Sequence, residues 1–274
     1  NVSMGDTFNL GWKLIAVLTG RCAPELLHSY TAERRAAAKA LVDFDHRWSR
    51  VVGTRDDSAD AEMPRVQREF IANGEFTAGL TVRYEPSALT GPDTWQALAT
   101  GFDLGKRFHS APAIRLADAK PMELGHAIEA DNRWRIFAFA PAGDHGQPGG
   151  AVHALCDFLE NGADSPIRRH TRAGEDFDAV IDLRAVFQQH FRELDYQAMP
   201  SALRPHKGIH GLCDYEKVFC ADIKSGNDLF AMRGIDRAQG CMVVVRPDQY
   251  VAQILPLSAH RELSEFFAGF LLPA

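Results

Sequence analysis

The 274-residue sequence predicts an α/β protein in which a helical first part, residues 1–104, precedes an α/β domain, residues 105–274. Helical periodicity dominates the beginning of the chain, whereas short runs rich in β-branched and aromatic residues occur only beyond Gly105. These runs follow the order strand, helix, strand, paired strands and final helix. That order is typical of a thioredoxin-like α/β sandwich.

The first predicted helix covers about residues 4–19. Ser3 followed by Asp6 fits a capping box, and Gly20 is a natural stop. Glycine in a helix interior is less favourable than alanine by about 1 kcal/mol, so Gly11 predicts close backbone packing. An apolar stripe indicates that the helix lies inside a larger body: Met4, Phe8, Gly11, Ile15 and Leu18.

A second helical region begins with Pro24 and Glu25, which suit a first turn. Its predicted apolar face carries Ala37, Leu41, Phe44, Trp48 and Val51. The polar stretch 53–65 is predicted to be an exposed loop, 65–73 a further helix, and 86–94 another loop.

Strands are predicted within residues 133–140, 177–187 and 241–255, and a helix over 151–161. Pro247 and Asp248 supply turn chemistry inside the third run, which therefore reads as an antiparallel hairpin. Ser258 is expected to open a C-terminal helix with a face formed by Leu263, Phe266, Phe267 and Phe270.

Composition and charge exclude several classes of function. A net charge of −6 gives no reason to expect nucleic acid as a partner. The apolar stretch near residues 8–19 is too short to span a bilayer, so we expect no membrane partner. The five cysteines are scattered and odd in number, which favours a reducing cytoplasm over a disulfide framework.

No catalytic or metal-binding residue is predicted in the chain. His206, His210, Cys213 and Cys220 match no common zinc spacing. Charged residues near the middle of the second helix are interpreted as a solvated surface rather than an acid–base group: Asp43, Asp45 and His46. The junction between the first strand and helix of the thioredoxin-like part lacks cysteine, and Cys156 lies inside the helix without a partner, so we expect no redox activity.

The beginning of the first helix is the most informative candidate site. Free backbone N–H groups and the helix dipole favour negative charge there, such as that of a flavin pyrimidine edge, although most helix ends are merely capped. Four segments make the case specific, because residues 1–20, 26–50, 105–121 and 243–252 resemble FAD-dependent aromatic (phenolic) hydroxylases. In that family a Gly-Met-Asn turn enters this helix and its backbone meets the flavin ring. The resemblance therefore implies cofactor contacts at Asn1 and Val2.

The resemblance further implies FAD as cofactor, NAD(P)H as cosubstrate, ortho-hydroxylation of a phenolic substrate with O2, and a homodimer or higher homo-oligomer. The family's Gly-x-Gly-x-x-Gly fingerprint is absent, and the glycines of residues 143–150 have the wrong spacing. We therefore expect the C-terminal portion of a longer enzyme, inactive and without retained FAD on its own. The alternative, a non-catalytic thioredoxin-like module for dimerisation or interaction, stays open.

Overall fold

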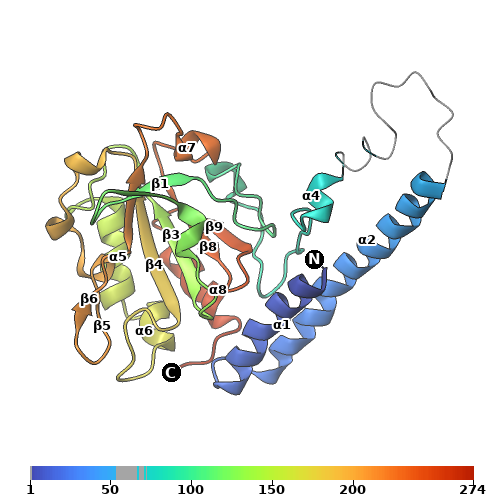
Figure 1. The fold of residues 1–274 in the computed structure, drawn as a ribbon. Helices are drawn as coiled ribbons and strands as arrows, with labels where there is room; N and C mark the ends of the chain where they lie inside the picture. Colours follow the sequence, from blue (N-terminus) through green and yellow to red (C-terminus); the bar gives the residue numbers. More distant parts are fainter. Residues whose placement is uncertain (1, 54–66, 68–70, 72) are drawn as a thin grey trace.

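The computed structural model describes residues 2–53, 67, 71 and 73–274. Two long helices, α1 (Val2–Leu18) and α2 (His28–Gly53), lie side by side and are joined by the 3-10 turn η1 (Pro24–Leu27). They stand against one side of an α/β body, and α2 extends beyond it (Figure 1). A short helix, α4 (Gly74–Thr77), lies between α2 and the body.

The body is built on a seven-stranded mixed sheet in the order β2-β1-β7-β4-β3-β8-β9. β4 pairs in parallel with β3 and β7, and all other neighbours in this sheet are antiparallel. The strands are β1 (Pro112–Arg115), β2 (Lys120–Glu123), β3 (Trp134–Phe139), β4 (Ile181–Phe187), β7 (Val218–Ala221), β8 (Cys241–Val245) and β9 (Val251–Leu255). A separate hairpin pairs β5 (His206–Lys207) with β6 (Leu212–Cys213).

Each face of the sheet carries its own hydrophobic core, because successive strand residues point to opposite faces. Trp134, Ile136 and Ala138 of β3 belong to one core, which also takes residues from α1, α5 (Ala151–Asn161), α6 (Pro166–His170) and α8 (His260–Ala268). Phe137 and Phe139 belong to the other, with residues of the 98–128 segment and α7 (Leu229–Met232). Both faces are covered, and the central strands are therefore buried along their whole length.

The predicted thioredoxin-like order is confirmed. β3, α5 and β4 form a parallel β-α-β unit, the β8–β9 hairpin lies on the other side of β3, and α8 follows. The predicted helix 151–161 coincides with α5, and residues 86–94 form no helix or strand. Sequence reasoning missed β1, β2 and β7, because each strand is only four residues long. In addition, β1 contains Pro112 and β2 contains Pro121, and proline weakens the sequence signal of a strand. The division at residue 104 stays a prediction.

One expectation for the helix ends is wrong, and two are confirmed, one of them with a shifted start. Ser3 is the second residue of α1, so it is not an N-cap. The C-terminal helix expected from Ser258 is present as α8, which begins two residues later at His260 and contains Leu263, Phe266 and Phe267, whereas Phe270 follows its end. Gly20 ends α1 as predicted: its φ is +68°, and the N–H of Arg21 donates to the Ala16 carbonyl at 2.7 Å, which is a Schellman motif.

The predicted buried face of α1 is also wrong. Met4 and Leu18 are 70% and 82% exposed in the described chain, and a Cβ added at Gly11 would meet no atom within 4 Å. The buried residues are instead Asn9, Trp12, Lys13 and Ala16. The polar members of this face are buried because charges from distant parts of the chain pair with them, as described below.

The second helical region is confirmed, with Pro24 in the first turn of η1. Gly53 is the last residue of α2, whereas the rest of the predicted 53–65 loop and most of the predicted 65–73 helix lie outside the described residues.

Candidate functional site

A cavity of about 760 Å³ opens beside the first turn of α1. It lies between α1, α2, the 76–83 segment and the turn that joins β8 to β9. Val2, predicted to contact a cofactor, lines this cavity, whereas Asn1 lies outside the described residues. The wall combines an apolar part with a few polar side chains, as ligand cavities do: Gly5, Phe8, Leu41, Phe44, Phe76, Arg34, Arg107 and Tyr250 are among its residues.

Arg34 of α2 holds the first turn of α1 in place. Its guanidinium pairs with Asp6 at 2.6 Å and donates to the Val2 carbonyl oxygen at 3.2 Å. A third hydrogen bond, also 3.2 Å long, reaches the hydroxyl of Tyr84. Gly5 permits this approach, because a Cβ at that position would lie 3.0 Å from a terminal nitrogen of Arg34. The beginning of α1 is therefore positioned by a buried cation from the neighbouring helix.

A second group of side chains, here called the Arg246 cluster, binds both helices to the α/β body. Its members are Asn9, Lys13, Glu33, Arg246 and Asp248. The guanidinium of Arg246 donates twice to Glu33, at 2.6 and 2.9 Å, and twice to Asp248, at 2.9 and 2.8 Å. Lys13 and Asn9 of α1 each lie 2.7 Å from the same Glu33 carboxylate.

Burial and ion pairing shift the pKa values of Glu33 and Lys13 in opposite directions. Burial alone would raise the pKa of Glu33, but the charges of Arg246 and Lys13 outweigh it and lower that pKa to about 2. For Lys13, burial lowers the pKa, and this outweighs the raising effect of Glu33. Glu33 is thus held as a carboxylate at neutral pH. Because it is hydrogen-bonded from α1 and from the β8–β9 turn, it ties the two together.

The Arg246 cluster could not be predicted from local sequence patterns. The only signal was a pair of polar residues, Asn9 and Lys13, at i,i+4 spacing in an otherwise apolar helix, together with the Arg246-Pro-Asp248 turn. Glu33 and Arg246 are 213 positions apart, so local patterns could not pair them.

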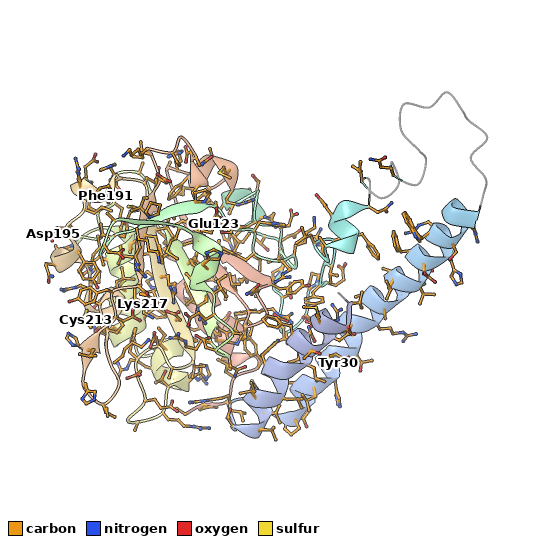
Figure 2. The ribbon with its side chains drawn as sticks, viewed as in Figure 1. Tyr30, Glu123, Phe191, Asp195, Cys213 and Lys217 are labelled. Atoms are coloured by element: carbon orange, nitrogen blue, oxygen red, sulfur yellow. The ribbon has the colours of Figure 1, made fainter. Side chains whose placement is uncertain are left out.

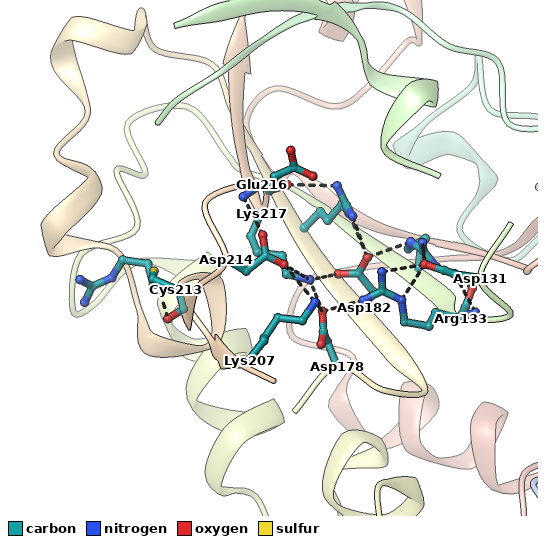
Figure 3. Close-up of polar contacts among 12 residues, drawn as sticks. Asp131, Arg133, Asp178, Asp182, Lys207, Cys213, Asp214, Glu216 and Lys217 are labelled. Atoms are coloured by element: carbon teal, nitrogen blue, oxygen red, sulfur yellow. Dashed lines mark hydrogen bonds and ion pairs between the residues drawn. The ribbon is translucent and has the colours of Figure 1, made fainter. Parts of the chain in front are cut away.

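A third group of charges, here called the Asp182 cluster, lies at one end of β3 and β4 (Figure 3). Asp182 is fully buried and pairs with Arg135 at 2.8 Å, Arg184 at 3.0 Å and Lys217. Burial raises its pKa, but these cations lower it well below the ordinary range. The carboxylate of Asp178 pairs with the guanidinium of Arg133 at 2.8 Å and with the ammonium of Lys207 at 2.9 Å. Because the charges pair with one another, the cluster is structural in character.

The loop 143–150 caps a helix. The carboxylate of Asp144 accepts hydrogen bonds from the N–H groups of Gly146 at 2.8 Å and Val152 at 2.9 Å, at the beginning of α5. A Cβ at Gly150 would lie 2.5 Å from the Asp144 carboxylate. Gly146 and Gly150 therefore accommodate the carboxylate of Asp144 at the beginning of α5.

The remaining candidates are distributed over the structure. His206 Nδ1 lies 2.7 Å from the Gly211 carbonyl, Cys213 donates to the Arg204 carbonyl, and Cys220 is buried in β7. Among the described residues, no three His, Cys, Asp or Glu side chains are placed to hold a metal ion. Burial raises the pKa of the Cys156 thiol in α5 far above its usual range. Asp43, Asp45 and His46 are exposed on α2, as expected for a helix surface.

No helix that the structure describes combines the length and the apolar character needed to cross a membrane.

The wider comparisons agree with this architecture. The family model of the phenol hydroxylase C-terminal dimerisation domain matches residues 82–274, and that of an FAD binding domain matches residues 1–45. The chain is 51% identical over 275 residues to 3-hydroxybenzoate 4-monooxygenase of Comamonas testosteroni, covering 99% of this chain and 43% of that protein. It is 33% identical to the FAD-dependent monooxygenase terD of Aspergillus terreus, covering 99% and 45%.

Among solved structures, the flavin-dependent monooxygenase PieE in complex with FAD and substrate has a similar fold, with a TM-score of 0.53 at 18% identity. That match covers 98% of this chain and 43% of PieE. The chain spans less than half the length of these relatives. On the family-model match and the 51% identity, the chain belongs to the family of FAD-dependent phenolic hydroxylases and contains their C-terminal dimerisation domain.

Proposed function

We propose that this chain is the C-terminal portion of an FAD-dependent monooxygenase that hydroxylates a phenolic ring ortho to its hydroxyl group, using NAD(P)H and O2. The observation that carries the proposal is the cavity beside Val2, in the segment that matches an FAD binding domain. The relative in Comamonas testosteroni is named for oxidation at position 4 of 3-hydroxybenzoate, which is ortho to its hydroxyl group. That name makes 3-hydroxybenzoate the first phenol to test.

The first turn of α1 borders the cavity, and its helix end favours the negative charge that a flavin would bring. Val2 and Gly5 line the cavity, and the positive end of the helix dipole lies at Val2. Such a helix end stabilises negative charge by about 0.3–1 kcal/mol when exposed and up to about 2 when partly buried. We propose that Asn1 and Val2 contact the flavin ring. When bound, FAD supplies the oxygen activation that the side chains of a protein lack.

The chain's own contribution is position. Arg34 fixes the Val2 carbonyl, and the Arg246 cluster fixes the rest of α1 against the α/β body. We propose that the residues that activate the phenol lie outside this chain, which supplies one wall of the flavin site. On its own the chain is expected to retain no FAD after gel filtration, and a stoichiometric yellow complex would contradict this.

The test uses the enzyme that carries this chain together with an FAD-binding segment. Purified enzyme should show flavin absorbance, and 3-hydroxybenzoate should stimulate NAD(P)H oxidation and O2 uptake. Mass spectrometry and NMR should identify 3,4-dihydroxybenzoate as the product. Running NADH and NADPH in parallel identifies the cosubstrate. If the enzyme contains FAD but neither 3-hydroxybenzoate nor any other phenol yields a hydroxylated product, the proposal is wrong.

We also infer a homo-oligomer, most simply a dimer, in the cytoplasm. The match to a dimerisation domain supports the first inference, and the five free cysteines support the second. The alternative of a non-catalytic dimerisation or interaction module is less well supported, because the FAD binding domain model also matches the chain. The hydroxylation assay distinguishes the two.

A further inference from the structure

The β5–β6 hairpin presents large apolar side chains to solvent. Ile209 in its turn is 95% exposed and Leu212 in β6 is 69% exposed. Tyr215, shortly beyond β6, is also exposed and stacks on Tyr196 with ring centroids 5.3 Å apart. Single exposed apolar residues are ordinary. Three exposed large apolar side chains within residues 209–215 are a stronger indication of a contact surface.

The hairpin is firmly anchored. Lys207 pairs with Asp178 at 2.9 Å and with Asp214 at 3.1 Å, so the strands are fastened to the Asp182 cluster (Figure 3). The N–H of Gly208 donates to the Asp176 carboxylate at 2.8 Å, and the N–H of Asp214 donates to the Pro205 carbonyl at 2.9 Å.

Pairing also keeps these two half-buried anchoring groups, Lys207 and Asp214, charged. Although burial opposes both shifts, the neighbouring opposite charges raise the pKa of Lys207 and lower that of Asp214. A surface ordered before binding loses less conformational entropy when a partner arrives. The hairpin therefore has the rigidity expected of a contact surface.

The hairpin's location leaves it free of the candidate cofactor site. In Figure 1, β5 and β6 lie on the side of the α/β body away from α2. Figure 2 likewise places Cys213 far from Tyr30 of α2. A partner on the hairpin would not obstruct the cavity beside α1. The hairpin also lies within residues 82–274, which match a dimerisation domain.

We infer that the β5–β6 hairpin, with Ile209, Leu212 and Tyr215, forms part of the contact surface between two copies of this chain. This inference rests on the proposed homo-oligomer and names the surface that forms it. Most homodimers are two-fold symmetric, and each copy would then contribute the same hairpin to the interface.

The test measures self-association of the 274-residue chain by sedimentation velocity over a range of concentrations. Ile209→Asp and Leu212→Asp should each raise the dimer Kd about tenfold or more, as expected for apolar residues central to an interface. Ile223→Asp is the matched control, because Ile223 is 58% exposed and follows the opposite end of β7. It should leave the Kd unchanged. All three positions are exposed, so thermal melts of the variants should match the wild type.

Three results would overturn the inference. Wild-type Kd values in both hairpin variants would show that copies associate through another surface, and the homo-oligomer proposal would stand. An equal loss in the Ile223 control would indicate a general effect of added charge. A wild-type chain that is monomeric at every concentration would refute the homo-oligomer proposal and the hairpin inference together.

Discussion

Glu33→Gln tests whether the Arg246 cluster holds α1 against the α/β body. The carboxylate accepts hydrogen bonds from Arg246, Lys13 and Asn9, and its pKa falls from 4.5 to about 2. A shift of this size corresponds to about 3 kcal/mol of folding stability at neutral pH. Removing one partner of a buried ion pair gives a similar range, about 3–5 kcal/mol. We therefore expect the free energy of unfolding to fall by about 3 kcal/mol at pH 7.

The pH dependence gives a sharper test. Because folding lowers the pKa of Glu33, its contribution is fully present well above pH 4.5 and is lost as the pH falls towards about 2. The difference between wild type and Glu33→Gln should therefore shrink between about pH 5 and about pH 2. Urea unfolding followed by tryptophan fluorescence measures both, since Trp12 lies beside Lys13 and Arg246.

Glu25→Gln is the matched control, because Glu25 is exposed in η1 and should change stability by less than about 0.5 kcal/mol. A loss below about 1 kcal/mol for Glu33→Gln, or a difference that stays constant from about pH 7 to about pH 3, would refute the reasoning.

Three further predictions concern backbone, cofactor and thiols. Gly11→Ala should stabilise the chain by about 0.5–1 kcal/mol, because the space around Gly11 is open and alanine favours the helix. Gly150→Ala should destabilise it by about 1–3 kcal/mol, because the new Cβ would displace the Asp144 carboxylate that accepts from the N–H of Val152. Thermal melts that shift equally in both variants would contradict both predictions. In an enzyme with its FAD-binding segment, Val2→Pro should weaken FAD retention and lower the flavin reduction potential, with Ser3→Ala as a near-neutral control. Proline removes the backbone N–H of residue 2 but fits the first helical position, so the variant should fold. If the folded variant keeps the FAD retention and the reduction potential of the wild type, α1 does not face the flavin. The chain should not catalyse insulin reduction, and activity that disappears in Cys156→Ala would overturn the expectation for this buried thiol.

The sequence by itself determined the elements whose signal is local. α5 spans the predicted residues because Val152, Leu155, Cys156 and Leu159 recur at helical spacing. The strands β3, β4, β8 and β9 were predictable because each is a short run rich in β-branched, aromatic or other apolar residues. Four segments were also enough to indicate the family, which the comparisons confirmed.

Only the tertiary structure decided which face of α1 is buried and what surrounds the candidate site. Periodicity identifies an apolar and a polar stripe, but it does not say which stripe meets the body. In this chain the buried face is mixed: Trp12 and Ala16 pack into the core, while Lys13 and Asn9 reach Glu33, which also pairs with Arg246, 213 positions away. Burying such charges is unfavourable unless opposite charges meet them, and those meetings depend on the folded path of the chain. The exposed tip of the β5–β6 hairpin could not be predicted from the sequence for the same reason. The ion pair between Lys207 and Asp178 that anchors it forms only in the folded chain.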